Sequence, residues 1–149
     1  MNDVLNALEF IVALPEGWMA IPVMDTFGGN PNMPKSDSVK LCKGAQSQFD
    51  MFTKPLIEIT FYGKKQGIMA PKTAYRNVVD LAPFATGNHI WTGFCASALM
   101  GKELILLWED TGEYQYQVVL WPKGEDETIG LEDNDVVMIL QSISPKTVP

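Results

Sequence analysis

Two residue types that can do acid–base and nucleophilic chemistry stand close together in NHIWTGFC, residues 88–95. The segment holds the single histidine of the chain, His89, and one of its two cysteines, Cys95. A catalytic dyad needs its base within about 2.6–3.2 Å of the thiol. In a strand, however, six residues at about 3.3 Å each separate the two side chains by roughly 20 Å. We therefore expect His89 near solvent at a strand end and Cys95 as a small buried hydrophobe, not a dyad.

The spacing of ligand-type residues does not indicate a metal site, and we expect no cofactor. Zinc sites usually draw four His or Cys ligands from closely spaced pairs, whereas Cys42 and Cys95 lie 53 residues apart. The run EDETIGLEDND, residues 125–135, is rich in carboxylates but lacks the register of a calcium-binding EF-hand loop. Ahead of calcium binding, it is predicted to be a solvated turn whose negative charge complements the N-terminus of the following helix.

Other catalytic signatures are incomplete. FGGNP, residues 27–31, lacks the sequence context of a phosphate-binding loop, and GFCAS, residues 93–97, misses the G-x-S-x-G pattern of a nucleophile elbow. Glu109 and Glu113 flank a predicted hairpin turn, and nothing in the sequence suggests a desolvated pocket around them. We therefore do not expect an enzyme, although an enzyme of unidentified class stays as an alternative.

Length and composition favour one domain over residues 1–149. Hydrophobic residues make up 46% of the chain and charged residues 19%, against about 25% charged in a typical domain. The net charge of −7 argues against nucleic acid as a partner, because such binding needs a cationic surface. The N-terminus is a poor signal peptide, and no window approaches the roughly 18 apolar residues of a membrane span. We expect a cytoplasmic protein without membrane insertion, whose two cysteines allow one disulfide but no disulfide framework.

Apolar patterning predicts an antiparallel sheet. Strands are predicted over residues 9–15, 38–45 (as an edge strand), 55–65, 89–98, 103–109 and 114–121. The last three strands are joined by short connections that contain glycine. Because a parallel crossover needs a dozen or more residues, these three strands are predicted to form an antiparallel meander in sequence order.

Two helices are predicted beside the strands. In APKTAYRNVVDLAPF, residues 70–84, apolar side chains fall on one helical stripe and Pro83 ends the pattern; the stripe comprises Ala74, Tyr75, Val78, Val79 and Ala82. In DNDVVMILQSIS, residues 133–144, Asp133 or Asn134 caps a closing helix. The apolar face of the closing helix comprises Val136, Ile139, Leu140 and Ile143. The fold class predicted is α+β.

Large apolar residues recur in segments that otherwise look irregular. They are Met24, Phe27, Met33, Phe49, Met51, Phe52, Ile68 and Met69. One interpretation is that they pack under their own loops as satellites of the core. The other is a partner-binding surface, because methionine adapts to varied partners and exposed apolar patches mark interaction sites. These eight residues are the candidate binding residues, either for an apolar segment of another protein or for self-association.

The order of elements resembles the PsbP/DcrB-like superfamily, which includes the yeast Ran-release factor and bacterial effector chaperones of the Eag type. The resemblance rests on FIVALPEGW, PLIEITFYGKK with the predicted helix after it, the meander from His89 to Trp121, and DVVMILQSISP. It implies an α/β/α arrangement, in which helices sandwich an antiparallel sheet, and a protein that binds other proteins without a shared catalytic site. The leading functional expectation is thus a non-enzymatic adaptor or effector chaperone. A small-ligand or lipid carrier, with its ligand between sheet and helix, is the alternative.

Overall fold

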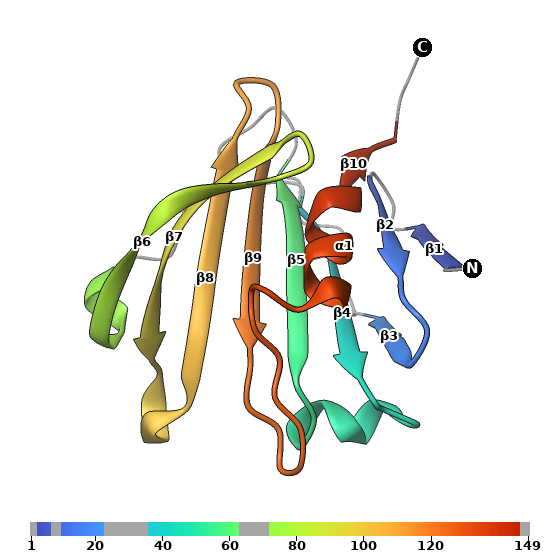
Figure 1. Cartoon of the computed structure of the whole chain (residues 1–149), viewed down its shortest axis with the longest axis vertical. Helices are drawn as coiled ribbons and strands as arrows, with labels where there is room; N and C mark the ends of the chain where they lie inside the picture. Colours follow the sequence, from blue (N-terminus) through green and yellow to red (C-terminus); the bar gives the residue numbers. More distant parts are fainter. Residues whose placement is uncertain (1–2, 7–9, 23–35, 63–71, 147–149) are drawn as a thin grey trace.

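The computed structural model describes residues 3–6, 10–22, 36–62 and 72–146. These residues form ten strands in two antiparallel sheets, one α-helix and three short 3₁₀ helices (Figure 1). The small sheet has the order β1 (Asp3–Asn6), β2 (Phe10–Leu14), β10 (Ser144–Pro145). The large sheet has the order β3 (Trp18–Pro22), β4 (Ser36–Lys43), β5 (Leu56–Tyr62), β9 (Gln115–Trp121), β8 (Glu103–Asp110), β7 (His89–Ser97), β6 (Arg76–Thr86).

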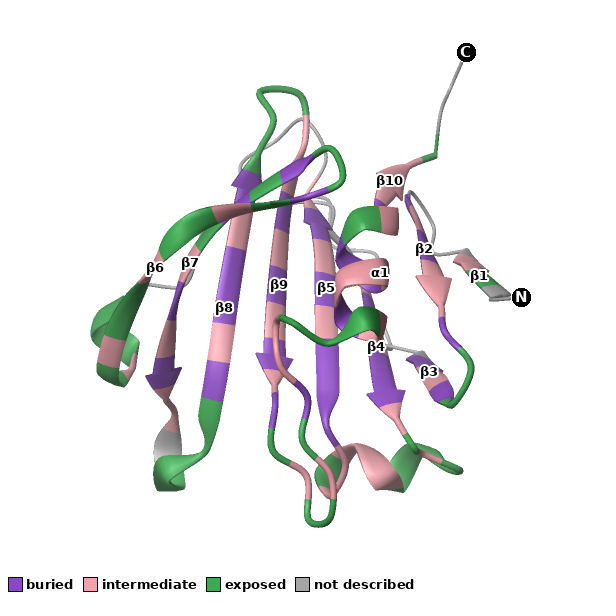
Figure 2. Ribbon diagram, in the orientation of Figure 1, coloured by how far each residue is buried: buried purple, intermediate pink, exposed green. Residues whose placement is uncertain are grey.

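The main core lies between one face of the large sheet and a layer made of β2 and α1 (Asn134–Ser142). Val136, Ile139, Leu140 and Ile143 are all buried there, which confirms the predicted apolar face of the closing helix. Along β9 buried residues alternate with more exposed ones, as the purple bands of Figure 2 show. The alternation follows from the two-residue period of a strand, which sends every second side chain toward the helix.

The predicted α+β fold class and its α/β/α sandwich are both wrong, because the described residues are mostly β. Strands dominate the described part of the chain, and its single α-helix lies on one face of the large sheet. The antiparallel character of the sheet was predicted correctly. The meander is confirmed, because Phe94 of β7 pairs with Leu106 of β8, which pairs with Val119 of β9, all antiparallel.

The error traces to residues 70–84, where a helix was predicted and β6 is found after the short η2 (Lys72–Ala74). The pairing of β6 with β7 slips twice, between Arg76 and Val79 and between Leu81 and Phe84. The half-buried positions of β6 fall on both faces of the sheet: Leu81 and Phe84 pack against the main core, whereas Val78 packs on the opposite face. In this edge strand with shifted register, apolar residues do not alternate strictly with polar ones, so the two-residue period that identifies a strand is missing from the sequence.

A second correction concerns residues 38–45, which were predicted to form an edge strand. They belong largely to β4, which lies inside the large sheet with β3 on one side and β5 on the other. Lys40 of this strand lies on the face opposite the main core, which holds Val39 and Leu41. There its ammonium group is 3.6 Å from the carboxylate of Glu58 on β5. A polar face therefore does not identify an edge strand.

Strand β7 approaches β8 very closely at Gly93. A Cβ atom at this glycine would lie 1.9 Å from the carbonyl oxygen of Leu106, so only glycine fits. His89 and Trp91, before Gly93, are buried on the side of α1. The β6–β7 hairpin bends toward α1 (Figure 1), and Gly87 in its turn faces Gln141 of the helix.

Replacement of Gly93 by alanine should therefore destabilise the fold. The clash is with backbone, which has less room to move than a side chain, so we expect a loss of about 1–3 kcal/mol or more in the free energy of unfolding. Urea denaturation would measure the loss. Gly130→Ala is the matched control, because a Cβ atom at that glycine would meet nothing within 4 Å. Equal stability of the two variants would contradict the close approach.

Candidate functional site

The single histidine lies in the core. His89 is only 8% exposed, so the expectation that it lies near solvent is wrong. It begins β7 directly after the two-residue turn Gly87–Asn88, and Gly87 has the positive φ of 60° that such a tight hairpin turn favours. The turn brings the end of the hairpin over α1 and removes the histidine from water.

Both ring nitrogens of His89 have hydrogen-bond partners. Nδ1 lies 2.5 Å from Oε1 of Glu109, and Nε2 lies 2.5 Å from the carbonyl oxygen of Ile143. The other carboxylate oxygen of Glu109 accepts the backbone N–H of Ile90 at 2.6 Å. Because a carbonyl oxygen can only accept, Nε2 is the donor to Ile143. The pair joins the sheet to the end of α1.

Aromatic rings enclose this pair. Trp91 stacks on the imidazole with the ring centroids 5.2 Å apart, and Tyr116 meets it edge-on at 5.7 Å. The indole N–H of Trp91 donates to the hydroxyl of Thr86 at 2.8 Å. With both imidazole nitrogens engaged and the ring buried, His89 has no free acceptor to offer a substrate as a general base. The arrangement is suited to holding the fold together.

Reasoning from the sequence missed Glu109, which it judged only as one of two carboxylates beside a turn. The residue is 7% exposed. The pairing Thr92–Trp108 places Glu109 opposite Trp91, and residues 89 and 91 share a face of β7. A register assigned to the predicted β7–β8 hairpin would have placed Glu109 beside the histidine.

Removal of one member of this pair should be costly. Glu109→Ala leaves a buried imidazole without its partner, so we expect a loss of about 3–5 kcal/mol in the free energy of unfolding. The double variant with His89→Ala should lose less than the sum of the two single losses, by about 0.5–3 kcal/mol. Urea denaturation of the four proteins completes the cycle. Glu113→Ala, in an exposed turn, is the control, and additive losses would contradict the coupling.

Tyr116 introduces a second polar group into the same core. Its hydroxyl is buried and has no hydrogen-bond partner among the described residues. Burial raises the pKa of this hydroxyl well above its usual value of 10.0, and the nearby carboxylate of Glu109 raises it further. The phenol therefore stays protonated in the folded protein at pH values where it would ionise in an unfolded chain.

This difference predicts sensitivity to alkali. Above about pH 10 the unfolded chain releases the Tyr116 proton while the folded chain keeps it, so stability falls as the pH rises. Tyr116→Phe removes the titration and also a buried unsatisfied hydroxyl. We expect stability that is unchanged or higher at pH 7 and a smaller loss between pH 10 and 11 than in the parent chain. Thermal melting at both pH values tests this, and equal alkaline losses in both proteins would contradict it.

A different surface lies at the end of the large sheet where β5 and β8 begin and β4, β7 and β9 end (Figure 1). We call it the loop end. It comprises η1 (Gln48–Phe52), η3 (Leu99–Gly101) and the turn over residues 122–129. Of six large apolar side chains that are well exposed in the described residues, three lie here: Phe49, Phe52 and Met100. The loop end is thus the candidate contact surface.

Only three of the eight predicted binding residues lie within the described residues. Phe49 and Phe52 are each 71% exposed, whereas Met51 packs partly against the cluster that contains Cys42 and Leu56. Side chains three residues apart eclipse each other on a 3₁₀ helix, so the two phenylalanines share one side of η1. The other five, which the structure does not describe, are Met24, Phe27, Met33, Ile68 and Met69.

Hydrogen bonds centred on Asp50 hold η1 in place. Its carboxylate accepts the backbone N–H groups of Gln46 and Ser47 at 2.8 and 3.3 Å. Its carbonyl oxygen accepts those of Thr53 and Lys54 at 3.0 and 2.9 Å. Because these bonds fix both ends of the short helix, the two exposed phenylalanines project from a rigid support.

The turn over residues 122–129 is bonded to the two residues that directly follow η1. The backbone N–H of Glu125 donates to the carbonyl oxygen of Thr53 at 2.8 Å, and the Lys54 ammonium lies 3.0 Å from a carboxylate oxygen of Asp126. Their hydrogen bond raises the pKa of Lys54 and lowers that of Asp126. Within the described residues, no three metal-ligand side chains gather closely enough to hold an ion.

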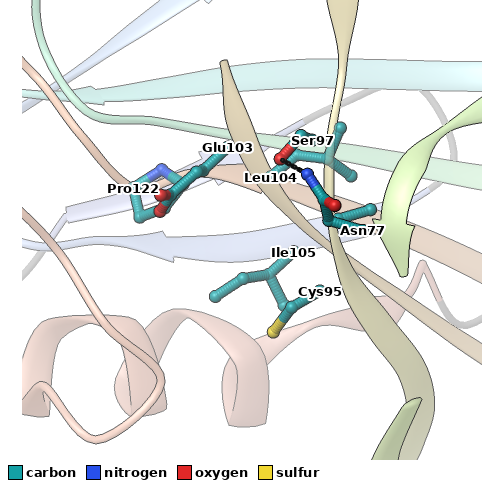
Figure 3. A pocket seen from close by; sticks show the side chains of 8 residues that line it. Asn77, Cys95, Ser97, Glu103, Leu104, Ile105 and Pro122 are labelled. Atoms are coloured by element: carbon teal, nitrogen blue, oxygen red, sulfur yellow. Dashed lines mark hydrogen bonds between the residues drawn. The ribbon is translucent and has the colours of Figure 1, made fainter. Parts of the chain in front are cut away.

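The loop end also contains a hollow of about 360 Å³ (Figure 3). It lies on the face of β7 and β8 that is turned toward α1, the inner face of the sheet. Its lining residues are Asn77, Cys95, Ala96, Ser97, Glu103, Leu104, Ile105 and Pro122. Two cross-strand pairs supply half of this lining, Cys95 with Ile105 and Ser97 with Glu103. The amide nitrogen of Asn77 donates to the Ser97 hydroxyl at 3.5 Å.

The thiol in this hollow is not an activated nucleophile. Cys95 is free and half-buried, whereas it was expected to be buried. Burial raises the pKa of its thiol, and the carboxylate of Glu103 raises it further, so little thiolate forms at neutral pH. Cys42, the other free cysteine, is buried.

Comparisons with protein-family models, with curated proteins and with solved structures gave no match. The resemblance to the PsbP/DcrB-like superfamily therefore stays a prediction, without the α/β/α arrangement that it implied. Among the described residues, no helix has the length and apolar character needed to cross a membrane.

Proposed function

We propose that this chain is a non-enzymatic protein-binding module, an adaptor or effector chaperone, that contacts an apolar segment of its partner through the loop end. The observation that carries the proposal is the pair Phe49 and Phe52, each 71% exposed on a short helix that is fixed at both ends. Single exposed apolar residues are common on protein surfaces. Two aromatic rings on one side of one rigid turn are a stronger feature.

Rigid aromatic side chains suit the centre of an interface. Binding energy at interfaces concentrates in a few anchors, often aromatic, that lose little conformational freedom on association. The support of η1 by Asp50 and by the turn over residues 122–129 means that its backbone is already ordered before a partner arrives. Met100, fully exposed in η3, adds a flexible apolar contact at the same end.

Polar pairs surround these apolar residues, as at the rim of many interfaces. The ion pairs Lys43–Glu127 and Lys54–Asp126 lie beside η1, at 3.5 and 3.0 Å. Lys123 and Glu103 form another pair, at 3.0 Å, beside the hollow. Exposed pairs of this kind contribute little to stability, and they can exchange partners when a second protein docks.

The alternative of a carrier finds less support. It placed the ligand between the sheet and the helix, but that space is filled by the packed side chains of the main core, among them Leu107, Val136 and Ile139. The hollow at the loop end is near the lower limit of about 300 Å³ for small-molecule sites, and it is open to solvent.

Affinity capture with matched variants tests the proposal. The parent chain and the double variant Phe49→Ser/Phe52→Ser would be immobilised and exposed to lysate of the source cells, and bound proteins would be quantified by mass spectrometry. Loss of two anchors should weaken binding of a true partner about tenfold or more. Because both side chains are exposed, the melting temperature should stay close to that of the parent.

The control is Ile90→Ser, which removes a side chain of similar exposure, 62%, at the opposite end of β7. It should leave the captured proteins unchanged. If the double variant retains every protein that the parent captures, or if Ile90→Ser loses the same proteins, the loop end is not the contact surface.

A further inference from the structure

We propose that the hollow beside β7 and β8 receives a cationic side chain, lysine or arginine, of the protein partner. The inference rests on the proposed function and specifies the chemistry of the partner. The hollow combines an apolar wall with polar groups, and three of these groups can accept a hydrogen bond: the Glu103 carboxylate, the Ser97 hydroxyl and the amide oxygen of Asn77.

This combination fits the two halves of a long basic side chain. Lysine and arginine pack an aliphatic stem against apolar surface while the charged head reaches polar groups. In the hollow, Ile105 and Pro122 offer the apolar contact. Because the amide nitrogen of Asn77 is directed to Ser97, its oxygen is left to accept from an incoming cation.

Charge within the lining is negative. Glu103 is the one residue of the lining that carries a formal charge. Its carboxylate raises the pKa of the Cys95 thiol, so the negative charge of Glu103 acts on groups inside the hollow. Lys123 pairs with Glu103 at 3.0 Å from outside the lining. Both side chains are more than half exposed, at 63% and 53%, so water screens this pair and an incoming cation can compete for the carboxylate.

Position links the hollow to the apolar contacts. Ser97 and Glu103 flank η3, which carries Met100, and Pro122 begins the turn that braces η1. A protein segment laid across the loop end therefore passes the hollow. The net charge of −7 favours partners that bring positive charge to this surface.

Cys95 makes the hollow testable before any partner is known. Symmetrical disulfides of similar length, with cationic, neutral and anionic ends, would be cystamine, 2-hydroxyethyl disulfide and 3,3′-dithiodipropionate. The Cys95 thiolate attacks one sulfur, a mixed disulfide forms, and one small thiol leaves as its thiolate. Intact-mass measurement of the equilibrated mixtures gives the adduct fraction, and Cys95→Ser identifies the site, since Cys42 is buried.

We expect the cationic adduct to be favoured over the anionic one by about tenfold, because only the cation can form a charge-assisted hydrogen bond with Glu103. Glu103→Gln should abolish most of this preference, and Glu113→Gln, in the exposed turn after β8, should preserve it. The same ratio in the parent chain and Glu103→Gln, or no preference in the parent, would overturn the inference. Neither result depends on Phe49 or Phe52, so the outcome of this experiment and the outcome of the affinity-capture experiment are independent.

Discussion

The bridge from Glu109 through His89 to the carbonyl oxygen of Ile143 is the constraint on which the rest of the fold depends. A charged or strongly polar group is tolerated in an apolar core only when its hydrogen-bonding capacity is met. Here the imidazole meets it with one partner on β8 and one at the end of α1. The β6–β7 hairpin must therefore stay folded toward the helix, and Gly93 permits the close approach of β7 to β8 that this curvature needs.

The helix α1 covers one end of the inner face of the large sheet and leaves the other end uncovered. α1 has nine residues, which span about 14 Å, whereas the eight residues of β8 span about 26 Å. The helix can thus cover only about half the length of the strands. The hydrogen bond from His89 to the carbonyl oxygen of Ile143 holds the end of α1 near the hairpin turn. The uncovered part of the sheet face that is turned toward α1 therefore lies toward the loop end. The hollow beside Cys95 and Ile105 occupies this part.

Prediction from sequence succeeded where one local rule determines the structure. Short glycine-containing connections gave the meander, and the apolar stripe gave α1 with Val136 and Ile139 buried. It failed where an irregularity altered the period. Residues 76–86 form a strand whose register shifts twice, so they lack strict alternation, and without the helix predicted there the sandwich is absent. The polar core and the hollow both depend on cross-strand register, which no single segment of sequence displays.

The charge of the chain bears on the choice between another protein and a second copy as the occupant of the loop end. Two copies that meet through the same surface would bring the carboxylates of Glu125 and its neighbours together, in a chain of net charge −7. Like charges brought together across an interface disfavour association, whereas a basic segment gains from the same field. Exposed Phe49 and Phe52 are therefore compatible with a chain that stays apart from its own copies. The carboxylate of Glu103 in the hollow and the apolar anchors together favour a partner that is both apolar and positively charged.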